Sequence, residues 1–336
     1  NLPNVPVYDI AIHPRESDLI IGTHGRGIYI IDDISFLRQI NSDILNMDVY
    51  IFDSEPAKIA IPNEQQDFPG NADFVGPNPP EVATITYYLK ERHIFGDMKI
   101  EVYDSKGNLL NTLPAGKRRG INRIKWYMRM KPPKVPPSPQ LEGRALFGPM
   151  IRAGIYTVKL IKNENIYTRR LKVIYDPKYP HSEEDRALQQ KTIMELYNMQ
   201  EELAKLSDAL NQTKNEIRKY LPKLKKKDKL TKNIQAFIDK LDNLHKSIVA
   251  TRKGAAITGE EKLRERIVDL YSAVSNYAGR PTKSQLDRME SLKIEMQQAF
   301  RSYENIMSTD LEIINKQLVK KKLSKIEYIK LENKSF

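Results

Sequence analysis

The second half of the chain has the spacing of apolar residues that is typical of amphipathic helices. Leucine, isoleucine, methionine and aromatic positions recur three or four residues apart in four runs, 196–217, 230–248, 263–277 and 289–306. Pro222 separates the first run from the second, Gly254 and Gly259 separate the second from the third, and Pro281 precedes the fourth. The sequence therefore predicts four helices.

The connections between these runs are short, so consecutive helices should be antiparallel neighbours. Thr282 and Gln285 fit a capping box at the start of the fourth helix. We expect a four-helix antiparallel bundle with a C-terminal tail over residues 180–336, with an extended coiled hairpin as the alternative.

Between residues 45 and 176 the apolar period changes to two, which is typical of half-buried strands. The turn at 104–108 contains Gly107 and Asn108, which tolerate positive φ and so close a hairpin between 99–103 and 109–113. Further strands are expected at 49–52, 57–61, 83–90, 121–128, 154–161 and 166–174. Seven or eight strands favour an immunoglobulin-like or fibronectin-like β-sandwich over 45–179. The proline-rich segment 131–139 cannot continue a central strand, so we expect it on the surface.

Residues 1–44 form a third predicted domain with strands at 7–12, 19–22 and 27–31. So short a segment buries little apolar surface alone. Its strands are apolar on both faces, which predicts either one blade of a larger assembly or a sheet whose edge is covered by a partner.

The amino-acid composition excludes several kinds of chemical site and supports one domain boundary. The chain has no cysteine, which excludes disulfides, thiol nucleophiles and cysteine-ligated metals. Its formal net charge is +12, and only Pro222 and Pro281 of the 20 prolines follow residue 180, which supports a boundary at 177–180. No apolar stretch approaches the roughly 20 residues of a transmembrane helix. The first residues do not have the charged-then-apolar pattern of a leader, so we expect any targeting segment to have been removed or to lie outside this sequence.

The run from Leu19 to Asp33, with Thr23-His24-Gly25-Arg26-Gly27 at its centre and Phe36-Leu37-Arg38 after it, resembles the final blade of bacterial sortilin-like, BNR-type β-propeller proteins. Two later segments resemble the continuation of that family, Asn78-Pro79-Pro80 with Tyr87-Tyr88-Leu89 and Gly279-Arg280-Pro281-Thr282. Two others are similar to the immunoglobulin-like domain that also occurs in flagellar hook-capping proteins, Gly120-Ile121-Asn122-Arg123 with Trp126 and Ala153-Gly154-Ile155-Tyr156-Thr157.

The resemblance implies that residues 1–44 are an incomplete terminal propeller blade, with the rest of the propeller upstream. It also implies an extracytoplasmic bacterial location: periplasmic, cell-surface or secreted. Members are often labelled glycosyl hydrolases, but the sequence contains no Asp-box turn of the sialidase type. Any catalytic pocket of the family would therefore lie in the missing blades.

His24, Arg26, Asp32 and Asp33 are the candidate ligand-binding residues, because imidazole and guanidinium groups bind anions and paired carboxylates bind cations. The structural alternative is a tight turn whose polar side chains bond nearby loop atoms. The five histidines show no metal-ligand spacing, and we predict no catalytic residue, metal or cofactor in this chain.

Two lysine-rich runs, 223–229 and 320–322, lack the aromatic or arginine platform of single-strand binders, so we predict no nucleic-acid binding. Exposed tyrosines of the sandwich could stack on a glycan, but their default interpretation is ordinary sandwich core with the hydroxyl at the rim; they are Tyr87, Tyr88, Tyr156, Tyr167, Tyr175 and Tyr179.

No nucleophile, base and orienting group converge in the sequence, so we expect a non-catalytic scaffold that binds a protein partner or a glycan. The rival hypothesis is a glycosidase, which needs two facing carboxylates. Here it would combine Asp32 or Asp33 with Asp73, Glu81 or Asp97.

Overall fold

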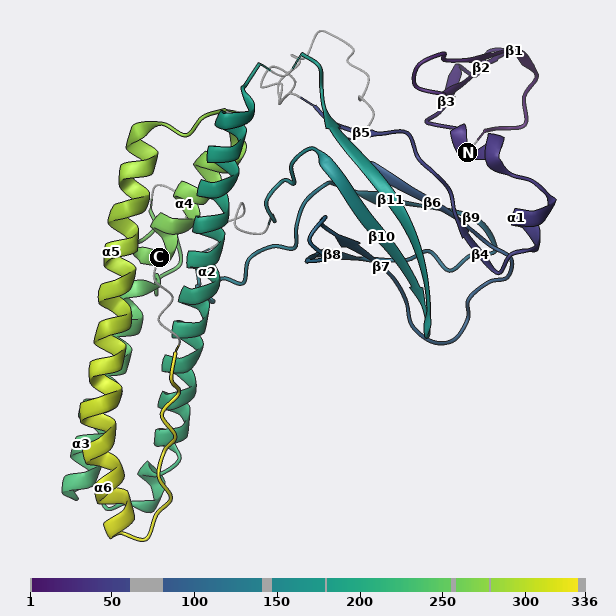
Figure 1. Cartoon of the computed structure of the whole chain (residues 1–336). Coiled ribbons are helices and arrows are strands. Elements are labelled where there is room, and N and C mark those ends of the chain that lie inside the picture. The colour runs from purple at the N-terminus through teal and green to yellow at the C-terminus, as the bar shows by residue number, and fades with distance from the viewer. Residues whose placement is uncertain are drawn as a thin grey trace. The chain divides into compact units, whose positions relative to one another are not determined.

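The computed structural model describes residues 2–60, 81–140, 147–178, 180–254, 258–277 and 279–331. The chain forms two compact units (Figure 1). A β-rich unit comprises residues 1–131 and 150–180, and a helical unit comprises 132–149 and 181–336. The proline-rich segment thus leaves the β-rich unit and belongs to the helical one.

The β-rich unit begins with a three-stranded antiparallel sheet in the order β1 (Val7–Ile12), β2 (Leu19–Thr23) and β3 (Ile28–Ile31). A 3₁₀ helix, η1 (Ser35–Gln39), and α1 (Ser42–Asn46) follow. The side chain of Asn41 caps α1 by accepting a hydrogen bond from the backbone N–H of Ile44 at 2.9 Å. Phe36, Ile44 and Phe52 form a small apolar cluster that attaches these two helices to the next sheet.

Two further sheets share one core. The first contains β4 (Val49–Ile51), β6 (Ala83–Leu89) and β9 (Gly120–Trp126), with β6 central. The second contains, in order, β5 (Ala57–Ile59), β11 (Asn165–Tyr175), β10 (Gly154–Lys162), β7 (Met98–Tyr103) and β8 (Leu109–Pro114). Alternate side chains of both sheets point inward, including Tyr87, Ile100, Trp126 and Leu160, all at most 1% exposed.

The predicted hairpin between β7 and β8 is confirmed. Gly107 has φ +83°, and the Asp104 carboxylate accepts hydrogen bonds from the backbone N–H groups of Lys106 and Asn108. Tyr87 of β6 and Tyr156 of β10 are buried, and burial raises the pKa of each to about 12. The predicted motif at 78–80 and Tyr179 lie outside the described residues.

The helical unit contains α2 (Glu183–Arg218), α3 (Lys229–Ile248), α4 (Leu263–Asn276) and α5 (Lys283–Asn305). A π-helical turn, η5 (Ile306–Leu311), joins α5 to α6 (Glu312–Lys320), so these three elements make one continuous rod. A short 3₁₀ turn, η4 (Leu221–Lys223), carries Pro222 and follows α2. The predicted capping box is confirmed: Gln285 N–H donates to Thr282 Oγ1, and Thr282 N–H donates to Gln285 Oε1.

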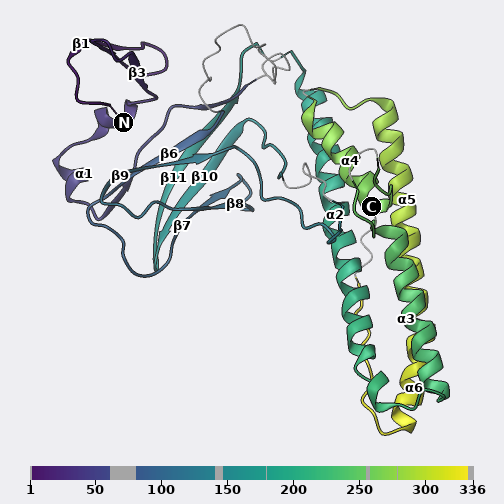
Figure 2. The same cartoon turned by 180° about the vertical axis from the view of Figure 1, so that it is seen from behind.

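Side-chain contacts show that α3 and α4 share one position in the bundle. Beside α2, Lys214 pairs with Asp242 of α3 at 2.7 Å, whereas Gln189, nearer the start of α2, binds the carbonyl of Val274 in α4. α3 and α4 therefore lie one after the other along α2 (Figure 2). The prediction of a four-helix antiparallel bundle was wrong in the placement of α3 and α4, which are not side-by-side antiparallel neighbours, because their 20 and 14 residues together match the 36 residues of α2.

The proline-rich segment packs one side against the helices, while its other residues keep the expected surface position: Lys131, Pro132, Lys134, Pro137 and Pro139 are exposed. Pro133 and Pro136 are buried. The Pro136 carbonyl accepts a hydrogen bond from Arg264 Nε at 2.9 Å, and the Gln140 side chain accepts one from the backbone N–H of Glu260 at 2.9 Å. Proline rings supply apolar surface, and their carbonyls remain free to accept, so such a segment can be buried where donors face it.

Candidate interaction surface

The β1–β3 sheet exposes large apolar side chains on both faces. Cross-strand pairing places Ile10 beside Ile21 and Tyr29, and Ile12 beside Leu19 and Ile31, on one face. The opposite face carries Ile20 and Ile30, with Ile28 farther along. The exposed fractions of five residues are large: Tyr8 72%, Ile10 61%, Ile12 50%, Ile28 72% and Ile30 59%.

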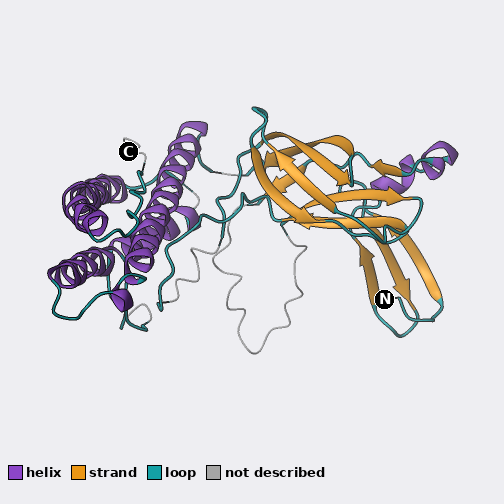
Figure 3. Ribbon diagram, turned by 90° about the horizontal axis from the view of Figure 1, so that it is seen from below, coloured by secondary structure: helices purple, strands orange, loops and turns teal. Residues whose placement is uncertain are grey.

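The sheet also has open edges. β1 pairs only with β2, and β3 only with β2, among the strands of the described residues (Figure 3, at the end marked N). All six residues of β1 are exposed, so its outer N–H and C=O groups face solvent. An exposed apolar edge strand is a template for pairing with another chain unless something covers it.

His24 and Arg26 lie in the turn between β2 and β3. Gly25 and Gly27 have φ +70° and +85°, which glycine adopts without strain. Thr23 Oγ1 donates to the Gly27 carbonyl at 2.6 Å, and the His24 ring lies 4.9 Å from the ring of Tyr8. The motif thus builds a tight turn.

Asp32 and Asp33 lie at the other end of β3. The Asp33 carboxylate accepts a hydrogen bond from Ser35 N–H at 3.0 Å, near the start of η1, while its own N–H donates to Asp18 Oδ1 at 2.9 Å. The carbonyl of Asp32 accepts a hydrogen bond from Arg123 Nη1 at 2.8 Å. The structure therefore separates the predicted site residues into two pairs at opposite ends of the sheet.

The carboxylates proposed for the rival glycosidase are spread apart as well. Glu81 lies just before the first residue of β6. Asp97 lies near the other end of β6, where Leu89 pairs with Gly120. It is placed there because the Lys117 ammonium, three residues before Gly120, binds the carbonyl of the neighbouring Gly96. A seven-residue strand spans about 20 Å at about 3.3 Å per residue, and glycosidase carboxylates lie about 5–9.5 Å apart, so at most one of these two acids can face Asp32 or Asp33 at that distance. Asp73 lies outside the described residues.

One serine–histidine pair lies in the helical unit: Ser207 Oγ is 3.3 Å from His245 Nε2. Ser207 is fully buried, and burial lowers the pKa of His245. The adjacent carboxylate, Asp242, pairs with Lys214 instead. A nucleophile must reach its substrate, so we interpret this pair as packing.

Across the residues that the structure describes, no cluster of three or more histidine, aspartate or glutamate side chains could hold a metal ion. The helices of this part of the chain are also too short or too polar to cross a membrane.

Comparisons with known proteins do not assign this chain. No family model matches it, and no curated protein matches it. Solved structures of α-2-macroglobulin match weakly. The Salmonella protein reacted with methylamine has a TM-score of 0.23 and 12% identity over 48% of this chain, and the trypsin-activated protein from Escherichia coli has 0.22 and 11% over 46%. Each match spans 9% of the neighbour's length, and TM-scores this low carry no argument about fold or function.

The predicted membership of the sortilin-like, BNR-type propeller family was therefore wrong. No family model and no curated protein matches the chain, and the solved structures that match it are α-2-macroglobulins, not propeller proteins. The physical reason lies in the motif itself. Its glycines, its threonine hydroxyl and its aspartates satisfy a tight turn and the approach to a 3₁₀ helix, which many unrelated sheets require.

Proposed function

We propose that this chain is a non-catalytic scaffold that binds a β-rich protein partner through the β1–β3 sheet. The observation that carries the proposal is the exposure of large apolar side chains on both faces of a sheet with two open edges. Scattered exposed apolar residues are ordinary, but a contiguous patch of this kind is typical of an interaction surface.

The partner's chemistry follows from the sheet. A strand of the partner would add to the outer edge of β1 through main-chain hydrogen bonds, and apolar side chains beside that strand would cover Ile10 and Ile12, which lie on the same face of β1. Full burial of an isoleucine contributes about 1.5–3 kcal/mol, so several such residues supply enough free energy for specific binding after association costs.

The adjoining two-sheet domain supports a scaffold role, and we propose that it is immunoglobulin-like. In support, the three-stranded β4–β6–β9 sheet faces the five-stranded one, and β5 pairs in parallel with the last strand, β11. Tyr156, near the start of β10, donates to the Arg152 carbonyl at 2.6 Å, as the tyrosine corner of such domains does. The extracytoplasmic bacterial location and the glycan ligand stay predictions.

Photo-crosslinking tests the binding role. Two variants of the full chain are compared, one with p-benzoylphenylalanine in place of Tyr8 and one with it in place of Tyr127. Tyr127 is 61% exposed but lies outside the β1–β3 sheet. We expect cells that produce the chain to yield a specific crosslinked protein from position 8, joined through one of its strands, and not from position 127. Equal crosslinking at both positions would contradict the proposal.

A further inference from the structure

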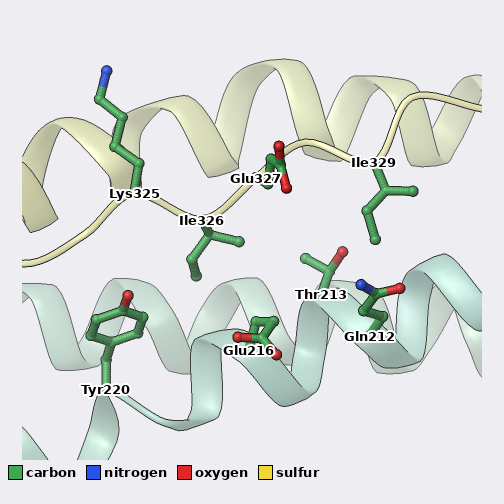
Figure 4. A pocket seen from close by; sticks show the side chains of 8 residues that line it. All are labelled: Gln212, Thr213, Glu216, Tyr220, Lys325, Ile326, Glu327 and Ile329. Carbon is green, nitrogen blue, oxygen red and sulfur yellow. The ribbon is translucent and has the colours of Figure 1, made fainter.

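After α6 the chain turns back and runs as an extended tail, residues 323–331, beside α2 (Figures 1 and 2). Its burial repeats every third residue: Leu323 and Ile329 are half-buried and Ile326 is 6% exposed. An extended chain of the polyproline II type has three residues per turn, so one row of side chains faces the helices. Figure 4 shows Ile326 and Ile329 pointing toward α2 and Lys325 pointing away.

Polar side chains of the helices bind the tail backbone. Asn315 makes two hydrogen bonds to Ile326: its Nδ2 donates to the carbonyl at 2.9 Å, and its Oδ1 accepts from the N–H at 2.8 Å. Two tyrosine hydroxyls donate to further tail carbonyls, Tyr220 to Ser324 at 3.1 Å and Tyr303 to Ile329 at 2.8 Å. The helices thus form a groove that recognises an extended backbone with an apolar side chain at every third position.

The tail leaves part of its groove open. A pocket of about 260 Å³ that opens to solvent lies between α2 and the tail, lined by Gln212, Thr213, Glu216, Tyr220, Lys325, Ile326, Glu327 and Ile329. Of the tail residues that line it, only Ile326 is buried. A segment with few buried side chains is expected to open more easily than the helices beneath it.

The turn that sends the tail back is strained. The N–H of Leu323 donates to the Leu318 carbonyl at 3.0 Å and that of Lys322 to the Val319 carbonyl at 2.9 Å, which is a Schellman motif. Lys322 occupies the left-handed position of this motif at φ +58°, where glycine is usual. Residues 312–331 contain neither glycine nor proline, so a straight continuation of α6 competes with the turn.

We propose that the tail exchanges between two copies of the chain. When α6 continues through Lys322, the tail leaves its own groove, and the groove of a second copy receives it, reciprocally. The occupant is a second copy because the segment that this groove holds is the tail itself. Short strained hinges favour such exchange. This inference is independent of the partner proposed for the β1–β3 sheet.

Mixing two full-length variants tests the exchange. Ile326→Asp prevents the tail from binding any groove but keeps the groove intact, whereas Asn315→Ala weakens the groove but keeps the tail intact. After equilibration, light scattering with size-exclusion chromatography should give monomers for each variant alone and a particle of twice the mass for the mixture. Association through the β1–β3 sheet would not need complementary variants. A monomeric mixture, or a dimer of either variant alone, overturns the proposal.

If Ile326→Asp fails to fold, two substitutions of the hinge residue Lys322 test the exchange instead. Lys322 is exposed, so its replacement leaves the core intact. Lys322→Gly fits the left-handed turn and should favour the monomer, whereas β-branched Lys322→Val should favour the straight helix and the dimer. We expect dimerisation constants that differ by about tenfold or more. Equal constants for the two variants would overturn the proposal.

Discussion

Replacing Glu265 by glutamine removes the negative charge from a buried ion pair in the helical unit. Arg264 and Glu265 are 6% and 4% exposed, and Arg264 Nη1 lies 2.6 Å from Glu265 Oε1. Arg264 Nε also donates to the Pro136 carbonyl at 2.9 Å, and Glu265 Oε2 accepts from the Ala250 N–H at 3.1 Å. The pair therefore joins the proline-rich segment, the end of α3 and the start of α4.

Glu265→Gln keeps the shape of the side chain but leaves a guanidinium buried without its counter-charge, which costs about 3–5 kcal/mol. For a unit of this size each kcal/mol lowers Tm by about 2–4 °C, so calorimetry should show a fall of about 6–20 °C. Asp287→Asn is the matched control, because the Lys283–Asp287 pair is 87% and 63% exposed. Such exposed helix pairs contribute about 0.3–0.5 kcal/mol.

Replacing both members of the buried pair, Arg264→Met with Glu265→Leu, should restore most of the lost stability, because neither charge is then left buried alone. The reasoning is refuted if Glu265→Gln lowers Tm no more than Asp287→Asn does, or if the double variant is less stable than Glu265→Gln.

Three further predictions concern single side chains. Tyr156→Phe removes the hydrogen bond to Arg152 and should lower the free energy of unfolding by about 0.5–1.5 kcal/mol in urea titration; an unchanged midpoint would count against the corner. Lys99 holds the pKa of Glu101 below its ordinary value of 4.5, so the stabilisation it gives is present at neutral pH and is lost as pH falls below that value. Wild type and Glu101→Gln should therefore differ in stability at pH 7 and converge as the pH falls below 4.5, and a constant difference contradicts this. Thr282→Ala should cost about 0.5–2 kcal/mol through loss of the cap, measured by thermal unfolding, whereas Thr282→Ser should cost little.

The local elements could be predicted from the sequence because their causes are local. Helix periodicity, Pro222 and the capping box at Thr282 set the helices, and Gly107 sets a hairpin. The packing of α3 and α4 end to end depends on relative helix lengths, and periodicity from residue 196 onward understates α2, which begins at Glu183. The return of the tail at Lys322 has no glycine or proline signal, because contacts with Asn315 and its neighbours decide it.

The candidate surface was visible in the sequence as strands that are apolar on both faces. The turn motif around His24 drew attention to polar residues instead, and the structure gives those residues local partners. Arg123, which holds the end of β3, has no signal in the sequence because it lies 91 residues from Asp32. Such contacts arise only from the tertiary fold.

The affinity of the protein crosslinked at Tyr8 for wild type and for the Ile10→Lys, Ile12→Lys double variant tests the binding role of the β1–β3 sheet most directly. Each isoleucine buried in the complex should contribute about 1.5–3 kcal/mol, so isothermal titration should show binding weakened by about 100-fold or more. Both side chains are well exposed in the free chain, at 61% and 50%, so the variant should keep its fold and its Tm. Affinities equal within about twofold would contradict a partner-binding sheet.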